Sequence, residues 1–165
     1  MADTISPARR SANMAAIRSR DTKPEVYIRK LLFARGYRYR KNYAGVPGHP
    51  DLYLAKYHAA VFVHGCYWHR HAGCTLCYTP KSRVDFWTAK FAENVARDAA
   101  VKAALREQNI RCLIVWECII RKMRKDEALE TAVIDRICAF LHSGVPYLEI
   151  GLEQTAALQD AAPLP

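Results

Sequence analysis

The pattern of apolar and polar residues divides the chain into two kinds of segment. Some have the spacing or composition of helices, and others have the alternation or the short apolar runs of strands. The helical segments are residues 7–19, a stretch that begins after Asp21 or Thr22 and ends at Gly36, residues 85–108 and residues 126–141. The strand-like segments are residues 37–40, 51–54, 59–63 and 110–117. The short connection between 51–54 and 59–63 predicts a hairpin. Helices and strands in this order predict an α/β sandwich on a mixed sheet.

The first helical segment is unlike the others because its only large apolar residues are Met14 and Ile17. That is too little apolar surface to anchor a helix in a core. We therefore expect residues 1–20 to form a basic N-terminal arm and residues 21–152 to form one compact domain. The tail at 153–165, rich in Ala, Gln and Pro, is expected to be disordered.

The net charge of the chain indicates what kind of partner it binds. Lys and Arg number 25 against 16 Asp and Glu, a net charge of +9, and the excess is concentrated in residues 1–41. A positive front end is typical of proteins that bind a polyanion, although a solvated basic face would look the same. The apolar runs are too short to span a membrane, and the first 20 residues hold no apolar signal core, so we expect a cytoplasmic protein.

A dense group of metal-ligand residues lies between the hairpin and the long helix. Cys66, His71, Cys74 and Cys77 fall within twelve residues, in a stretch with little apolar content. Thiolate and imidazole are the ligands of structural zinc, which would order such a loop. Cys118, just after a predicted strand, could supply the fourth ligand in place of Cys77. Spacing alone leaves both sets open.

Acidic and histidine side chains near the hairpin suggest hydrolysis. Asp51 opens the first hairpin strand, His64 follows the second, and His69 comes five residues later. A carboxylate suits Mg²⁺, and an imidazole can take a proton from water at neutral pH. Glu25 could supply a second carboxylate. Together these residue types serve metal-assisted phosphodiester hydrolysis, although each alone has an ordinary structural explanation.

Adjacent aromatic residues form a third group. Tyr67 and Trp68 lie in the polar metal-ligand stretch, and Phe86 and Trp87 open the long helix. Adjacent residues on a strand or helix cannot both face one core. Some of these rings are therefore expected at the surface, where they could stack on bases or wedge between them.

These residues together resemble the very-short-patch repair (Vsr) family of DNA mismatch endonucleases. The most specific segment is FVHGCYWHRH at residues 62–71. The match continues in the same order over about residues 9–120. Its other segments are MAAIR at 14–18, Asp21-Thr22, PGHPD at 47–51, TPKS at 79–82, Phe86-Trp87, Asn94 with Arg97-Asp98, and VWEC at 115–118.

The resemblance implies a single-domain restriction-endonuclease-like fold of the PD-(D/E)xK type, and a Mg²⁺-dependent bacterial enzyme. It would nick the strand 5′ of the T in T:G mismatches that arise when 5-methylcytosine deaminates. Its partner would be double-stranded DNA carrying that mismatch. A mismatch-repair protein is a further candidate partner, and the chain is expected to be a monomer.

The resemblance also implies roles for particular residues of the centre. Asp51 matches the family's metal-binding aspartate and His69 its catalytic histidine, with Glu25 and His64 in supporting positions. The superfamily's acidic-x-Lys motif is replaced here by Phe-Val-His at residues 62–64. A carboxylate ligand is therefore missing, and we expect the backbone carbonyl of Val63 to hold Mg²⁺ with Asp51.

Two further sets of positions follow from the same match. The structural zinc set is Cys66, His71, Cys74 and Cys118, which leaves Cys77 spare. The DNA-contacting set is Met14, which the N-terminal helix would place in the minor groove, and the mismatch wedge Tyr67, Trp68 and Trp87.

Two other functions fit part of the sequence. A zinc-ordered DNA-binding module without catalysis would explain the charge, the cysteines and the aromatic residues, but not the arrangement of Asp51 with His64 and His69. A restriction-type nuclease of the same fold would cut intact duplex on both strands. The products formed on mismatched and matched DNA separate these functions.

Overall fold

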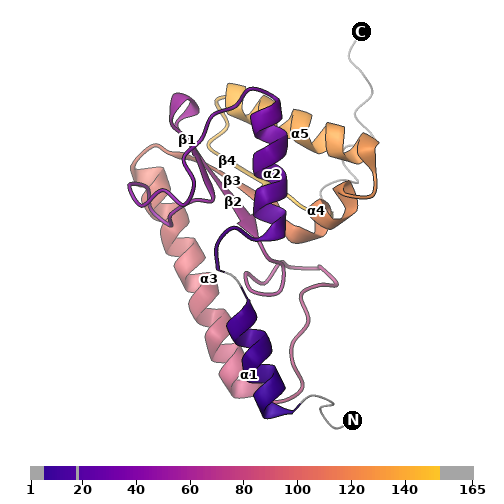
Figure 1. The fold of residues 1–165 in the computed structure, drawn as a ribbon. Helices are drawn as coiled ribbons and strands as arrows, with labels where there is room; N and C mark the ends of the chain where they lie inside the picture. Colours follow the sequence, from indigo (N-terminus) through magenta and orange to yellow (C-terminus); the bar gives the residue numbers. More distant parts are fainter. Residues whose placement is uncertain (1–5, 18, 153–165) are drawn as a thin grey trace.

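The computed structural model describes residues 6–17 and 19–152 (Figure 1). Within them no helix is long and apolar enough to cross a membrane. The helices are α1 (Pro7–Ala16), α2 (Lys23–Ala34), α3 (Val84–Glu107), α4 (Glu117–Met123) and α5 (Glu127–His142). The strands are β1 (Leu52–Leu54), β2 (Ala59–His64), β3 (Arg111–Trp116) and β4 (Tyr147–Ile150).

The four strands form one mixed sheet in the order β1-β2-β3-β4. The predicted hairpin is confirmed: β1 pairs antiparallel with β2, with Leu52 opposite Val61. β2 and β3 are parallel, with His64 opposite Trp116, and β3 and β4 are parallel as well. The start of β1 and the ends of β2 and β3 therefore meet at one edge of the sheet.

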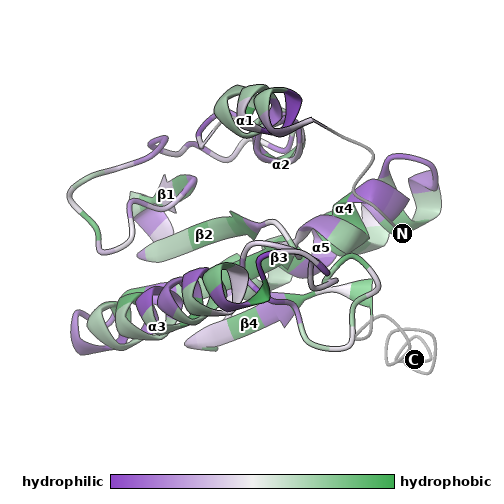
Figure 2. Cartoon of the chain, turned by 90° about the horizontal axis from the view of Figure 1, so that it is seen from below, coloured by the Kyte–Doolittle hydropathy of each residue, from purple (hydrophilic) through white to green (hydrophobic). Residues whose placement is uncertain are grey.

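Each face of the sheet carries its own core, because successive strand residues point to opposite sides. Leu113 and Val115 of β3 face α2, α4 and α5, whereas Ile114 and Trp116 face α3 and the loop that follows β2. Figure 2 shows α3 on one side of the sheet, with α2 and the α4–α5 pair on the other. The predicted mixed α/β sandwich is confirmed.

The predicted strand at residues 37–40 is wrong. Only Arg40 pairs with the sheet, through an isolated bridge to Tyr53. Tyr37 instead donates its backbone N–H to Leu32 in the turn that ends α2, where Gly36 adopts φ +89°. The alternation of tyrosine and arginine has another cause. Tyr37 and Tyr39 pack against the core, although the segment does not form a strand.

Two elements were absent from the sequence prediction. α4 begins at Glu117, directly after β3, so its apolar residues continue the strand's run without a turn signal. β4 is a four-residue edge strand whose sequence, YLEI, has little alternation. Both depend on tertiary contacts, because β4 is held by pairing with β3 and α4 packs against α5.

α1 projects away from the sheet, at the lower end of the molecule in Figure 1. None of its residues is buried, and Met14 and Ile17 are 42% and 50% exposed. Ser6 caps the helix by accepting a hydrogen bond from the backbone of Arg9. The division into an arm at residues 1–20 and a domain at residues 21–152 stays a prediction. The expected tail at 153–165 lies outside the described residues.

Candidate active site and metal centre

A cleft of about 340 Å³ opens at the sheet edge where β1 begins and β2 ends. Asp51, Val63, His64 and His69 all line it, and Glu25 joins them from the first turn of α2. The structure therefore brings together every residue that the sequence assigned to catalysis. The start of β1 lies beside the end of β2 because these two strands are antiparallel, so residues that flank both strands open into one cleft.

Asp51 immediately precedes β1 and is held by its neighbour in the hairpin. Its Oδ2 accepts a hydrogen bond of 2.7 Å from the backbone N–H of Val63. Burial raises the pKa of Asp51 to about 6, although the Val63 N–H and the nearby Arg29 charge act in the opposite direction. A buried carboxylate that has few positive charges near it is a suitable ligand for a divalent cation. The bound cation would stabilise the ionised carboxylate.

His69 is oriented by an acidic residue that the sequence prediction missed. Its Nδ1 lies 2.7 Å from Oδ2 of Asp98, which comes from the middle of α3. Burial alone would raise the pKa of Asp98, but the hydrogen bond and charge of His69 lower it on balance. When Nδ1–H is donated to this carboxylate, Nε2 keeps the lone pair that can take a proton.

Asp98 could have been found only in part from the sequence. The Arg97-Asp98 pair lies in the segment that resembles the Vsr family. Nothing local, however, relates a carboxylate on α3 to a histidine 29 residues earlier. Their meeting depends on how α3 crosses the sheet.

His64 packs flat against His69, with ring centroids 3.7 Å apart and an interplanar angle of 10°. Burial, followed by the neighbouring His69, lowers the pKa of His64 to about 3, so its imidazole is neutral. Its Nδ1 is buried without a hydrogen-bond partner among the described residues. Ligand atoms of His64, His69 and Asp98 lie within 4.8 Å of one another. The lone pairs of two stacked imidazole rings, however, point in parallel directions and do not converge on one ion. This packing orients His69 better than it chelates a metal.

A second cluster gathers three thiols and an imidazole behind the cleft. Cys66, His71, Cys74 and Cys118 are all buried and offer ligand atoms within 4.8 Å of one another. Nδ1 of His71 lies 3.5 Å from both Cys66 Sγ and Cys118 Sγ. Zn–S bonds of about 2.3 Å and a Zn–N bond of about 2.1 Å at a tetrahedral angle would place sulfur and nitrogen about 3.6 Å apart. These separations fit one tetrahedral ion.

The tertiary structure separates the two ligand sets that spacing left open. Cys118 joins the cluster because α4 starts where β3 ends, beside the end of β2. Cys77 is outside it. A hydrogen bond from the Cys66 thiol lowers the pKa of Cys118 to about 6, opposed by burial. This cluster therefore already favours a thiolate at neutral pH, as a metal ligand requires.

A continuous stack of rings connects the two clusters. His71 stacks on Trp116 at 4.1 Å and 5°, Trp116 meets His64 edge-on at 5.4 Å, and His64 stacks on His69. Gly151 lies against both His71 and Trp116, and a Cβ atom at this position would lie 2.7 Å from Cε1 of His71 and 3.2 Å from Cδ1 of Trp116. The position of the catalytic candidate His69 thus depends on the packing of the cysteine–histidine cluster.

The predicted DNA-contacting residues border a second hollow of about 590 Å³ between α1 and the start of α3. Tyr67 lies 5.1 Å from Trp68 and 6.0 Å from Trp87, measured between ring centroids, and Met14 lines the opposite wall. Tyr78, which the sequence prediction missed, is 63% exposed and lies 4.9 Å from Tyr67.

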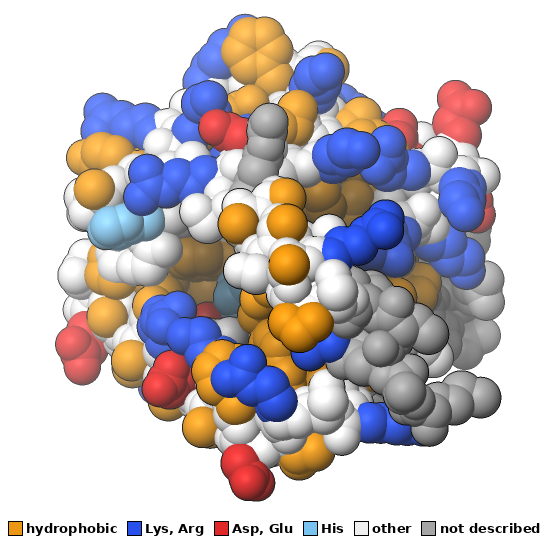
Figure 3. Space-filling view, turned by 60° about the horizontal axis from the view of Figure 1, so that its bottom comes forward, with side chains coloured by type: hydrophobic (Ala, Val, Ile, Leu, Met, Phe, Trp, Pro, Cys, Tyr) orange, Lys and Arg blue, Asp and Glu red, His pale blue; other side chains and the backbone are white. Residues whose placement is uncertain are grey.

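Basic side chains surround these hollows. Figure 3 shows Lys and Arg side chains spread over this end of the molecule, around a depression in which a histidine is visible. The basic residues that border the two hollows are Arg10, Arg20, Lys81, Arg83, Arg97 and Lys102. A polyanion laid across this face would contact the aromatic cluster and the Asp51–His69 cleft together.

Comparison with known proteins agrees with this geometry. A sequence profile described as DNA mismatch endonuclease Vsr matches residues 2–75. DNA mismatch endonuclease Vsr of Escherichia coli (strain K12) is 42% identical over 84% of the chain and 89% of the relative. Type II nicking enzyme V.XorIIP of Xanthomonas oryzae is 40% identical over 82% and 98%, and V.NmeAIP of Neisseria meningitidis is 42% identical over 73% and 86%. The chain therefore belongs to the Vsr family of DNA mismatch endonucleases.

Proposed function

We propose that this DNA endonuclease nicks duplex DNA 5′ of the T in a T:G mismatch, at sites where 5-methylcytosine has deaminated. The observation that carries the proposal is the adjacency of an Asp51 and His69–Asp98 centre to a half-buried aromatic cluster on a basic face. Relatives named for mismatch cleavage and for nicking support it. The proposed substrate is thus a duplex with one weakened base step.

His69 is the proton acceptor of the proposed reaction. His69 lines the cleft with Asp51, and its Nε2 takes a proton from the attacking water, while Asp98 stabilises the imidazolium through Nδ1. His64 holds the ring by stacking and stays neutral, so it adds no repelling charge. Lys102 and Arg97 of α3 line the same cleft and attract the phosphate.

Asp51 is the proposed holder of Mg²⁺, together with the backbone carbonyl of Val63. A bound Mg²⁺ supplies Lewis-acid polarisation of the scissile phosphate and neutralises its charge. Asp51 fits this role because one of its oxygens is fixed by the Val63 N–H and its burial disfavours an uncompensated charge.

The aromatic cluster is the proposed mismatch reader. Tyr67, Trp68 and Trp87 would enter the base stack at the T:G step, with Met14 of α1 in the minor groove. A mismatched step costs less to unstack than a paired one, so a wedge gains selectivity there. The DNA would be gripped between the arm and the compact domain of residues 21–152.

The cysteine–histidine cluster is proposed to hold a structural zinc ion. Cys66, His71, Cys74 and Cys118 fill the four positions of a closed tetrahedral site, which leaves no place for a substrate. The ion would order the loop that carries His69, Tyr67 and Trp68. We also infer that the whole domain is a variant of the restriction-endonuclease-like fold, acts as a monomer in the bacterial cytoplasm, and has a mismatch-repair protein as a further partner.

The test uses purified protein and end-labelled duplexes that differ only by T:G against T:A, in several cytosine-methylation contexts. A single nick 5′ of the mismatched T, present with Mg²⁺ and lost with EDTA, is expected. Cutting of both strands of matched duplex would favour a restriction-type nuclease. Binding without a nick in any context would contradict the proposed specificity.

A further inference from the structure

Arg29 is a buried cation that contacts Glu25 and Asp51, two residues that line the catalytic cleft. It lies on α2 and is 4% exposed, whereas most charged residues of the described chain reach solvent. A buried guanidinium is costly unless its N–H groups are paired. Its partners therefore reveal which groups the fold uses to compensate this charge.

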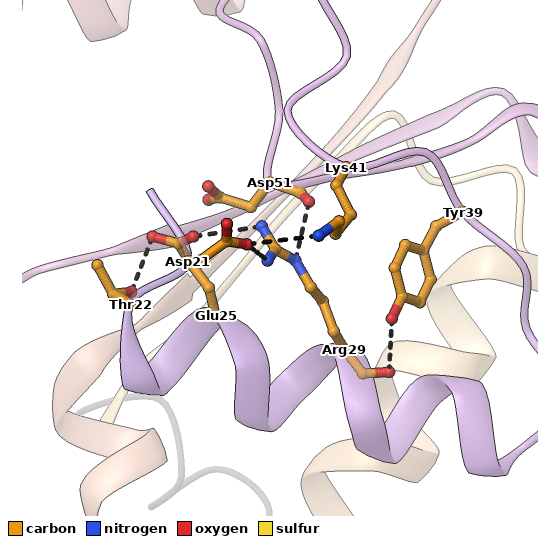
Figure 4. Close-up of polar contacts among 7 residues, drawn as sticks. All are labelled: Asp21, Thr22, Glu25, Arg29, Tyr39, Lys41 and Asp51. Atoms are coloured by element: carbon orange, nitrogen blue, oxygen red, sulfur yellow. Dashed lines mark hydrogen bonds and ion pairs between the residues drawn. The ribbon is translucent and has the colours of Figure 1, made fainter. Parts of the chain in front are cut away.

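The guanidinium joins three parts of the centre, as Figure 4 shows. Nη2 donates to Oε2 of Glu25 at 3.3 Å, Nε donates to the backbone carbonyl of Asp51 at 3.3 Å, and Nη1 pairs with the Asp21 carboxylate. Glu25 is as deeply buried as Arg29, but Asp21 is half exposed. The buried charge pair of this wall is thus Arg29 with Glu25.

Both carboxylate oxygens of Glu25 are engaged. Oε1 accepts a hydrogen bond of 2.8 Å from the hydroxyl of Thr22, and Oε2 is held by Arg29. Asp51 differs, because its carboxylate points away from the guanidinium in Figure 4 and is held by a neutral N–H. The two carboxylates of the centre are therefore held differently: Glu25 is hydrogen-bonded to a cation, whereas the Asp51 carboxylate is hydrogen-bonded to a neutral N–H and feels the Arg29 charge only through space.

We propose that Arg29 is a positioning residue that serves as the built-in cation of the centre, so that one divalent cation binds at Asp51 and Glu25 is not a ligand to it. This inference rests on the proposed role of Asp51 in holding Mg²⁺. The guanidinium keeps the Glu25 charge neutralised inside the wall, and through the Asp51 carbonyl it fixes the point where β1 begins. A second cation beside Glu25 would have to compete with Arg29 for Oε2, and a weakened pairing of a buried guanidinium is unfavourable.

The experiment measures Mn²⁺ binding to the zinc-loaded full chain by electron paramagnetic resonance and isothermal titration calorimetry. Mn²⁺ is used alone because it substitutes for Mg²⁺ at oxygen ligands and its free form gives a direct signal. We expect one equivalent for the unmodified protein and none for Asp51→Asn. Glu25→Gln keeps both hydrogen-bonding positions, so we expect it to retain one equivalent with a Kd within about threefold.

Removing the guanidinium tests whether Arg29 is what keeps a second cation away from Glu25. In Arg29→Met the Glu25 carboxylate loses its cation, and we expect a second equivalent of Mn²⁺ or binding at least about tenfold tighter. The double variant Arg29→Met/Glu25→Gln removes both charges and should return to one equivalent. Where Arg29→Met does not fold, Glu25→Gln and the double variant still decide the question.

Two results would overturn the inference while leaving the proposed function in place. One is two equivalents on the unmodified protein with one lost in Glu25→Gln; the other is a loss of Mn²⁺ affinity of more than about tenfold in Glu25→Gln. In both cases nicking of the T:G duplex would persist in the unmodified protein. Undiminished Mn²⁺ binding by Asp51→Asn would instead contradict the proposed metal role of Asp51.

Discussion

The hydrogen bond between Asp98 and His69 gives the sharpest prediction for the chemical step. Asp98→Asn preserves the size of the side chain and an acceptor oxygen, but it removes the negative charge 2.7 Å from Nδ1 of His69. The imidazolium that forms when His69 accepts a proton then loses its compensating charge. The substitution should slow nicking with little effect on DNA binding, because the pair lies in the cleft and not beside the aromatic cluster.

The size of the effect follows from the strength of a charged hydrogen bond. Such bonds contribute about 1.5–3 kcal/mol, which corresponds to a rate loss of about 10- to 150-fold. Solvent screens the pair only in part, since the His69 and Asp98 side chains are 30% and 21% exposed. We expect a loss of about 30-fold, near the middle of that range on a logarithmic scale.

The assay is single-turnover nicking of a labelled T:G duplex at saturating protein, with the Kd measured separately by fluorescence anisotropy. Glu107→Gln is the matched control, because it removes a carboxylate from the exposed end of the same helix and should leave both quantities unchanged. A rate loss below about threefold for Asp98→Asn would refute the assigned role, since a charged hydrogen bond to the proton acceptor must contribute more. A change in Kd as large as the change in rate would also refute it.

Three further predictions concern the cysteine–histidine cluster and its surroundings. Cys66→Ser should abolish zinc retention and lower the melting temperature, whereas Cys77→Ser should change neither; zinc analysis with thermal melting checks this, and equal behaviour of the two variants would contradict the ligand set. Gly151→Ala places a methyl group 2.7 Å from the ring of His71, so it should destabilise the fold by about 1–3 kcal/mol and weaken zinc retention, as measured by urea denaturation and chelator competition. The pKa of Glu149 lies below its ordinary 4.5 because hydrogen bonds from Tyr147 and Trp116 and the charge of Lys102 outweigh burial. Its contribution to stability is therefore complete above about pH 4.5 and lost as pH falls through the lowered pKa, so Glu149→Gln should be less stable at neutral pH and match the unmodified protein in acid; a constant difference across that range would contradict this.

Local sequence determined most of the secondary structure of this protein. α2, α3 and α5 follow from helical spacing and helix-favouring composition, and the β1–β2 hairpin follows from two apolar runs joined by a short connection. These elements were predictable because the free energy that selects them comes from neighbours in the chain. α4 and β4 were missed because β4 is defined by pairing with β3, and α4 by the way the chain turns after that strand.

The chemical character of the site was also visible in the sequence, but its connections were not. The motif at residues 62–71 and the Pro50-Asp51 pair identify a family whose members are DNA endonucleases, and they indicate an acid and a histidine in one cleft. Spacing could not decide between Cys118 and Cys77, because sequence distance does not measure spatial distance. The parallel pairing of β2 with β3 decided it, by bringing the start of α4 next to the metal-ligand loop.

Only the tertiary structure decided which charged groups lie next to each other in the site. It pairs Asp98 of α3 with His69, places Arg29 of α2 between Glu25 and the Asp51 backbone, and leaves the Asp51 carboxylate without a hydrogen-bonded cation. Electrostatic interactions in a cleft depend on distance and burial, and both are set by how helices from distant parts of the chain pack on the sheet. The sequence therefore determined the residue types available for the reaction, and the packing of α2 and α3 against β1 and β2 determined the role each of them can take.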